Sequence, residues 1–164
     1  MKKSLLIVVA LLGLSFAAAA QPKAIGLRGG LFGLSFNGEI SYQHWYTLFD
    51  NDYDFLEANL GVIKNGFKAT AMYNLTLAQP EMTDRGEWAV YAGPGVTVGY
   101  GTAWSESHQE NRTSAFAGLA AQVGLEYTFW FPLQLSVDFR PNFLLPVRFN
   151  QSWYGLALSA RYAF

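Results

Sequence analysis

The segment from Trp153 to Phe164 alternates between apolar side chains and small or polar ones, and this alternation constrains the fold more than any other feature of the chain. A period of two residues is typical of a β-strand. The apolar face continues to the aromatic Phe164, whereas the last residues of a soluble protein usually fray. A strand with an apolar outer face and aromatic ends is typical of a transmembrane β-barrel.

Seven further segments show the same alternation, so the sequence predicts eight strands in all. The predicted strands are residues 25–36, 39–48, 55–64, 67–77, 88–101, 114–129, 133–143 and 153–164. Each reaches the roughly ten residues that a tilted strand needs to cross a bilayer. We therefore expect an all-β fold, an eight-stranded antiparallel up-and-down transmembrane β-barrel with both chain ends on one side.

Local signals predict where the strands end and bend. Asn37-Gly38 and Asn65-Gly66 are predicted to form tight hairpin turns, because Asn-Gly is the strongest short hairpin signal. Residues 102–113 are predicted to form the longest polar loop. Pro94 and Pro141 each remove a backbone donor from the sheet and predict local bulges.

Residues 1–20 are predicted to be a cleaved signal peptide, so the barrel domain is expected to span residues 21–164. Lys2 and Lys3 form a positive start, an apolar run follows at 5–16, and three alanines at 18–20 provide the small-residue cleavage site. The apolar run is shorter than the roughly 20 residues that a spanning helix needs. The chain has no cysteine, which excludes disulfides and a lipid-modified cysteine at the cleavage site.

The overall charge excludes a class of partner. The chain carries 11 basic and 12 acidic residues, and two of the basic ones lie in the predicted signal peptide. The remaining chain is therefore acidic and lacks the basic footprint of nucleic-acid binding. Hydrophobic residues make up 51% of the chain and aromatic residues 16%, which favours a surface that meets lipid.

Apart from Lys64 at the end of its segment, the charged residues of the predicted strands gather on one face, four of each sign. They are Arg28, Glu39, Glu57, Lys68, Glu126, Asp138, Arg140 and Arg161. An eight-stranded barrel leaves interior room only for side chains, and buried charges need partners. We therefore expect these residues to form a salt-bridge network that fills and stabilises the lumen.

The aromatic residues of the opposite face sort to two heights along the predicted barrel. One group lies near the chain termini: Tyr46, Trp88, Tyr127, Phe129, Tyr162 and Phe164. The other lies at the far end: Phe67, Tyr100, Phe143 and Tyr154. Two aromatic girdles around an aliphatic band are what a bilayer favours.

Several blocks of the chain resemble a known family. They are AIGLRGG (24–30), EISYQHWY (39–46), YAGPG (91–95), GLEYTF (124–129), LQLSVDFRPNF (133–143) and LSARYAF (158–164). Together they resemble the small eight-stranded outer-membrane β-barrels of the OmpA/OmpX type. The resemblance implies a location in the outer membrane of a Gram-negative cell. The last block, with Tyr162 and Phe164, is similar to the C-terminal signal read by the outer-membrane insertion machinery, which implies a transient partner.

Two predicted loops contain residue types that can bind a metal or act in catalysis. Asp50, Asp52 and Asp54 alternate as calcium ligands can, but an EF-hand loop would have Gly and Glu where Phe55 and Gly61 stand. We therefore expect a solvated turn and no metal.

His108 lies among serine and glutamate residues in the predicted loop 102–113 and could belong to a lipid-modifying enzyme. Residues this close in sequence do not by themselves make a preorganised triad. We expect no catalytic residues and no cofactor, and a structural or interaction role, for example as an accessory subunit of a larger outer-membrane complex. A small pore lined by the inward charges, or a lipid-modifying enzyme, is the alternative.

Overall fold

The computed structural model describes residues 23–32, 35–45, 53–63, 65–105, 110–145 and 155–164. The predicted signal peptide lies outside the described residues, and so do Tyr46, Asp50, Asp52, His108 and Tyr154. Among the described residues, no helix is long and apolar enough to cross a membrane.

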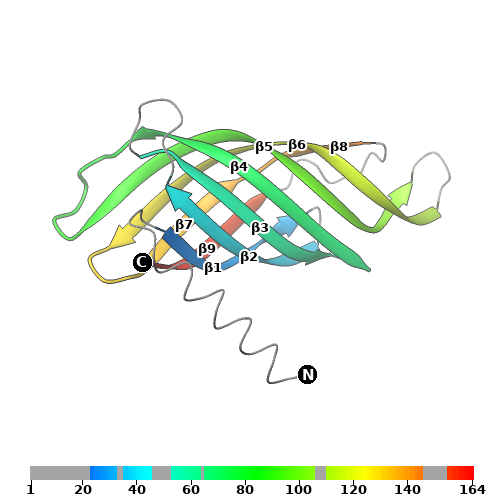
Figure 1. Cartoon of the computed structure of the whole chain (residues 1–164), viewed down its shortest axis with the longest axis horizontal. Coiled ribbons are helices and arrows are strands. Elements are labelled where there is room, and N and C mark those ends of the chain that lie inside the picture. Colours follow the sequence, from blue (N-terminus) through cyan, green and yellow to red (C-terminus); the bar gives the residue numbers. More distant parts are fainter. Residues whose placement is uncertain (1–22, 33–34, 46–52, 64, 106–109, 146–154) are drawn as a thin grey trace, which may run out of the picture.

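The described chain consists of antiparallel β-strands arranged in one closed sheet (Figure 1). The strands are β1 (Lys23–Phe32), β2 (Ser35–Trp45), β3 (Phe55–Ile63), β4 (Gly66–Ala78), β5 (Gly86–Ser105), β6 (Glu110–Phe129), β7 (Gln134–Phe139), β8 (Asn142–Leu145) and β9 (Leu156–Ala163). Consecutive strands pair from β1 to β6, and β9 pairs with both β1 and β7 to close the circle. Because β7 and β8 pair with β6 as two parts of one strand, the fold is the expected eight-stranded up-and-down barrel.

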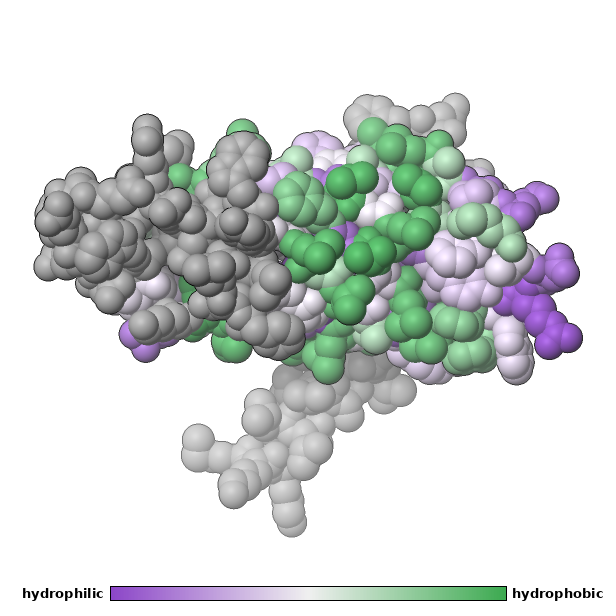
Figure 2. Space-filling model, turned by 180° about the vertical axis from the view of Figure 1, so that it is seen from behind, coloured by the Kyte–Doolittle hydropathy of each residue, from purple (hydrophilic) through white to green (hydrophobic). Residues whose placement is uncertain are grey.

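Burial follows the period of two that the sequence predicts. In β3, β7 and β9 buried and exposed residues alternate strictly along most of the strand. The buried face is mostly polar or charged, whereas the exposed face carries large apolar side chains such as Leu27, Val62 and Leu158. Figure 2 shows apolar side chains as a band across the middle of the barrel, with hydrophilic ones at one end.

The predicted hairpin turn at Asn37-Gly38 is wrong. Both residues lie inside β2, where Gly38 pairs with Gly29, and the pairing of β1 with β2 continues to Phe32 opposite Ser35. This register sets Arg28 directly opposite Glu39, and the two side chains form an ion pair inside the barrel. The local turn preference is therefore outweighed by the pairing of the whole strand.

The predicted turn at Asn65-Gly66 is displaced by one residue. Gly66 already pairs with Ile63 in the sheet, and Asn65 takes the turn conformation with φ of 55°. Asn tolerates this left-handed region better than most residues. Gly66 is required for a different reason, since a Cβ at this position would collide with the backbone carbonyl of Tyr100.

Replacing Gly66 by alanine is expected to destabilise the barrel by about 3 kcal/mol, the upper end of the usual cost of overpacking, because a clash with a backbone atom cannot be relieved by a side-chain shift. Gly38→Ala is the matched control, since a Cβ there has no neighbour within 4 Å. Urea unfolding in lipid vesicles, followed by tryptophan fluorescence, measures both variants. Equal stability of the two variants would contradict this account of Gly66.

The predicted loop at 102–113 is mostly strand, so that prediction is wrong. Thr102 pairs with Thr113, and the ladder continues to Ser105 opposite Glu110. The hydroxyls of Thr102 and Thr113 are 2.7 Å apart, and Asn65 donates to the Thr102 hydroxyl at 3.2 Å. Cross-strand pairing thus carries β5 and β6 through a stretch whose polar composition resembles a loop.

The two prolines behave differently. At Pro141 the strand is interrupted between β7 and β8, as predicted. At Pro94 the predicted bulge is wrong, because β4 and β5 keep one register from Met72 opposite Gly95 to Leu75 opposite Ala92. The irregularity instead lies on β4 between Thr76 and Ala78.

Candidate functional site in the barrel lumen

The structure places all eight charged residues singled out in the sequence inside the barrel, and none is more than 5% exposed. They come from seven strands and one strand break: Arg28 (β1), Glu39 (β2), Glu57 (β3), Lys68 (β4), Glu126 (β6), Asp138 (β7), Arg161 (β9), and Arg140 just after β7. Alternation along each strand turns them inward, and closure of the sheet brings them together.

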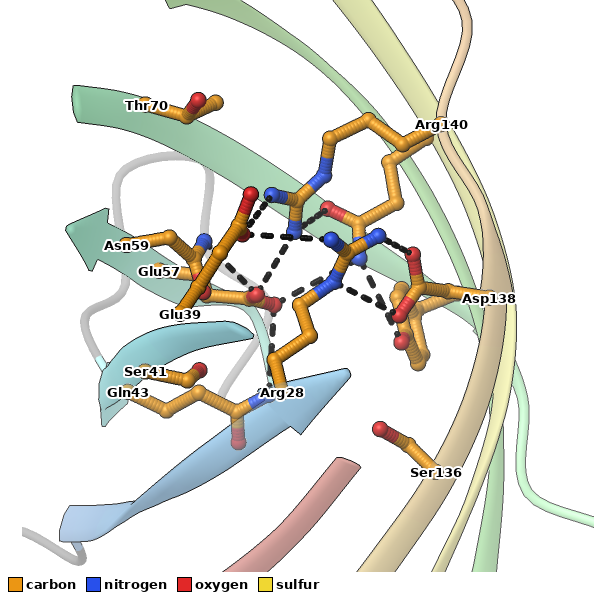
Figure 3. Close-up of polar contacts among 12 residues, drawn as sticks. Arg28, Glu39, Ser41, Gln43, Glu57, Asn59, Thr70, Ser136, Asp138 and Arg140 are labelled. Atoms are coloured by element: carbon orange, nitrogen blue, oxygen red, sulfur yellow. Dashed lines mark hydrogen bonds and ion pairs between the residues drawn. The ribbon is translucent and has the colours of Figure 1, made fainter. Parts of the chain in front are cut away.

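Glu39 is the centre of one part of the network. Its Oε1 atom lies 2.6 Å from the Lys68 ammonium. Its Oε2 atom lies 3.1 Å from Arg28 and 3.6 Å from Arg140. Arg28 also holds Asp138 with two guanidinium nitrogens (Figure 3). Three cations therefore converge on one carboxylate, and Asp138 supplies the second negative charge.

Glu57 is the centre of the other part. Its Oε1 atom accepts a 2.7 Å hydrogen bond from Arg140 and lies 3.3 Å from Arg161. Arg161 in turn lies 3.7 Å from Glu126. Because Arg140 contacts both Glu39 and Glu57, the eight charges form one connected network across the lumen. Figure 3 shows the part of it around Arg28, Glu39, Glu57, Asp138 and Arg140.

Arg140 lies in the break between β7 and β8, and this break sets its position. Pro141 has no backbone N–H, so β7 and β8 do not run on as one strand. The backbone N–H of Arg140 donates to the Gly155 carbonyl at 2.9 Å, and the Ala121 N–H donates to the Pro141 carbonyl at 3.2 Å. A Cβ at Gly155 would collide with the Arg140 backbone. These contacts hold the arginine where its side chain reaches both carboxylate centres.

Uncharged side chains complete the network, and sequence reasoning did not single them out. Gln43 donates to Glu126 at 3.1 Å and to Glu57 at 3.4 Å. Gln122 accepts a 3.1 Å hydrogen bond from Arg140. Alternation already places these glutamines on the inward face, but only the register decides which charge each one reaches.

Arg161 is also held by two hydroxyls. Its Nε donates to Ser41 and its Nη1 donates to Ser136, each at 2.9 Å. These bonds come from the two sides of β9, since Ser136 lies on β7, which pairs with β9, and Ser41 lies on β2, beyond β1. The guanidinium therefore spans the lumen instead of lying along one wall.

The chemistry of this arrangement is that of a packed ionic plug. Every carboxylate of the network has a cation within 4.0 Å, and each cation contacts at least one carboxylate. A fully paired buried network rigidifies its surroundings, whereas removal of one member leaves an uncompensated charge. The geometry thus supports a stabilising role for the interior.

Of the loop residues considered for metal binding or catalysis, Asp50, Asp52 and His108 lie outside the described residues, and Asp54 lies within them. Asp54 is buried and accepts hydrogen bonds from the Tyr73 hydroxyl and the Thr76 backbone N–H, both at 3.0 Å. It therefore fixes the chain where β3 begins. Within the described ranges, no group of three or more His, Cys, Asp or Glu side chains is arranged to hold a metal.

The outer wall carries aromatic residues near both rims. Near the chain termini, the rings of Trp88 and Tyr127 are 4.6 Å apart, and those of Tyr127 and Phe129 are 4.5 Å apart. Tyr162 and Phe164 stack at 6.1 Å and are about half exposed, at 57% and 45%. At the far end Phe67 pairs with Tyr100, and Phe143 lies on β8.

These features define a closed eight-stranded antiparallel up-and-down barrel with an apolar outer wall and an ionic lumen. Neither protein-family models nor curated protein sequences give a match. The fold is similar to the crystal structure of the N-terminal β-barrel domain of Pseudomonas aeruginosa OprF. The TM-score is 0.61 at 14% sequence identity, and the alignment covers 87% of this chain and 97% of that one. At this identity the similarity establishes a shared fold.

Proposed function

We propose that this protein is an integral outer-membrane β-barrel with a structural or interaction role. The observation that carries the proposal is the inversion of polarity, with charges inside and large apolar side chains outside. In water, an apolar wall of this extent is an aggregation hazard. In hydrocarbon it is the favoured surface, and a closed barrel satisfies every backbone group without water.

The aromatic rims support the same location. Trp88, Tyr127 and Phe129 form one contact group near the termini, while Phe67 and Tyr100 lie at the far end. Amphipathic rings favour the two membrane–water interfaces. We therefore propose outer-membrane lipid as the surrounding partner and residues 1–20 as the signal for export.

The interior supports a structural role over catalysis. In the proposal the ionic network fixes the barrel shape, and the outer wall is the surface that other molecules meet. The protein then acts without a cofactor, as an accessory subunit beside a larger outer-membrane protein complex. Tyr162 and Phe164, which face outward, are proposed as the signal read by the insertion machinery during assembly.

Location and assembly are tested together by expressing the full chain in a Gram-negative host. We expect it in the outer-membrane fraction, with a gel mobility that changes when the sample is boiled, because closed barrels resist detergent until heated. Recovery as a soluble periplasmic protein with unchanged mobility would overturn the proposal. The mass of the particle extracted in mild detergent then separates an autonomous barrel from a subunit of a complex.

Planar-bilayer recording separates the structural role from the alternative of a small pore. A lumen filled by paired side chains is expected to give no sustained ion conductance. A wild-type conductance that changes on Arg140→Ala or Glu126→Gln would favour the pore instead.

A further inference from the structure

A pocket of about 230 Å³ lies at the rim of the barrel that carries the chain termini. It is lined by Tyr53, which precedes β3, and by residues between 79 and 88, from the β4–β5 connection into the start of β5. This connection lies at the same end of the barrel as the C-terminus (Figure 1). Pockets that enclose a whole drug-sized ligand measure about 300–1,000 Å³. The smaller volume here suits a single polar group of a larger molecule.

Hydrogen bonds hold the segments that form this pocket against the barrel. The Thr83 hydroxyl donates to the Tyr127 hydroxyl at 3.3 Å, and the Tyr127 hydroxyl donates to the Arg85 carbonyl at 3.1 Å. The Thr76 hydroxyl donates to the Tyr53 carbonyl at 2.6 Å. The pocket therefore exists before a ligand binds, and this preorganisation lowers the cost of binding.

The charged groups that line the pocket are all negative. Glu81 and Glu87 line it, and both are exposed. Neither carboxylate belongs to an ion pair within the described residues. No lysine or arginine is among the lining residues, and the Thr83 hydroxyl adds a neutral acceptor. The pocket therefore suits a cation that can donate hydrogen bonds.

A primary ammonium fits this lining better than a metal ion or a quaternary ammonium. Ca²⁺ takes about six to eight oxygen ligands, and the described residues contain no group of three or more His, Cys, Asp or Glu side chains that could hold a metal. A primary ammonium has three N–H donors, which match Glu81, Glu87 and Thr83. Trp88 and Tyr53 also line the pocket, and aromatic faces attract cations. A quaternary ammonium has no N–H to donate to the carboxylates.

The position of the pocket favours a lipid as the source of this ammonium. Trp88 lines the pocket and also packs against Tyr127, in the aromatic group that the proposed function places at the membrane–water interface. Tyr53 and Met82 are 52% and 57% exposed, so this part of the rim also presents apolar side chains. The Trp88 indole N–H is buried and has no hydrogen-bond partner within the described residues. A phosphate oxygen of a lipid head group would supply one.

We propose that this pocket, here named the rim pocket (Tyr53, Glu81, Thr83, Glu87 and Trp88), binds the head group of a phospholipid that carries a primary ammonium, such as phosphatidylethanolamine. The inference rests on the membrane location proposed above. The ammonium donates to the two carboxylates, and the phosphate lies on the side of Trp88. An anionic head group is repelled by Glu81 and Glu87, and the three methyl groups of choline replace the N–H donors. The rim pocket therefore selects one head group among lipids with the same acyl chains.

The test compares head groups that differ only in these features. The wild-type barrel is reconstituted in vesicles of equal parts phosphatidylethanolamine, phosphatidylcholine and phosphatidylglycerol with the same acyl chains, extracted in mild detergent and measured by native mass spectrometry. We expect one retained phosphatidylethanolamine per barrel, about tenfold in excess of either other lipid, because charge-assisted hydrogen bonds distinguish it. In Glu81→Gln/Glu87→Gln this excess is expected to disappear. Trp88→Phe keeps the ring but removes the N–H, and is expected to lower retention several-fold.

Asp84→Asn is the matched control, because Asp84 is an exposed acidic residue of the same connection that does not line the rim pocket. It is expected to keep the excess of phosphatidylethanolamine. Vesicles of phosphatidylcholine alone offer no primary ammonium. In these vesicles Glu87→Gln and Asp84→Asn are both expected to unfold in urea as the wild type does.

Three results would overturn the inference. They are no preference for phosphatidylethanolamine in the wild type, the same preference in Glu81→Gln/Glu87→Gln, and an equal loss of preference in Asp84→Asn, which would reflect the net charge of the rim and not the pocket. Vesicle insertion, read from heat-dependent gel mobility, is scored separately. Failure of the membrane proposal is therefore distinguishable from failure of this one.

Discussion

Replacing Glu39 by glutamine is expected to destabilise the barrel by about 3–5 kcal/mol, the typical cost of removing one partner from a buried ionic network. Glu39 is the carboxylate on which Arg28, Lys68 and Arg140 converge. Glutamine keeps the size and the hydrogen-bonding oxygen but removes the charge. The three cations then repel one another in a site of low dielectric, with Lys68 left without any of the ion pairs described above.

Urea unfolding of the barrel in lipid vesicles, followed by tryptophan fluorescence, measures this loss. Glu87→Gln is the matched control, because Glu87 is exposed at the start of β5 and surface substitutions usually change stability by no more than about 0.5 kcal/mol. Adding Lys68→Met to Glu39→Gln is expected to restore part of the stability, because it removes one of the three cations that repel one another. A Glu39→Gln barrel as stable as the Glu87→Gln control would refute the ionic plug.

Deleting residues 162–164 is expected to abolish assembly of the barrel. These residues end the strand that closes the sheet, since Tyr162 pairs with Ile25 and Ala163 with Ala24. Lys23 and Phe164 also exchange two backbone hydrogen bonds, of 2.9 and 2.7 Å. The deletion removes the partners of β1 on its β9 side near the termini, and an open edge is not tolerated in hydrocarbon. The measurement is the fraction of protein with heat-dependent gel mobility.

A side-chain variant separates closure of the sheet from recognition by the insertion machinery. Tyr162→Ala/Phe164→Ala keeps the backbone hydrogen bonds, so refolding in detergent is expected to proceed nearly as in the wild type. In cells the same variant is expected to accumulate several-fold less folded protein, because the aromatic signal is gone. Equal losses in both settings would show that these rings act in folding alone. Gly38→Ala, at an open position of β2, controls for general effects of substitution.

The barrel itself followed from the alternation of the sequence. Eight segments with a period of two predicted the closed antiparallel fold, which is confirmed, and placed Arg28, Glu57 and Arg161 on the inward face. This succeeded because the side chains of a strand point alternately to its two faces whatever the strand pairs with. The inventory of the polar face, with four acidic and four basic residues among small ones, then indicated that this face lines the lumen and that the apolar face lies outside, because buried charges must be paired.

Local signals were less reliable where they conflicted with pairing. The Asn-Gly pair at 37–38 is a strong turn signal, yet it lies within β2 opposite Gly29 and Gly30. The polar stretch after Gly101 resembles a loop, yet it pairs with β6 as far as Ser105. A turn signal reflects the backbone preference of only a few residues. An error in register would move all the side chains of a strand to the wrong face, so the register prevails where the two conflict.

The identity of the partners in the lumen was decided only by the tertiary structure. Arg28 holds Asp138 across 110 residues of sequence, and Arg161 bonds Ser41 across 120. The hollow on the outer wall lined by Ala58, Ala69 and Ala71 likewise exists because the registers of β3, β4 and β5 bring these residues together. The sequence by itself determined which side chains face inward, since that depends on local alternation. Which inward residues meet depends on the register offsets between neighbouring strands, added up around the barrel. This total offset is set only when the barrel closes.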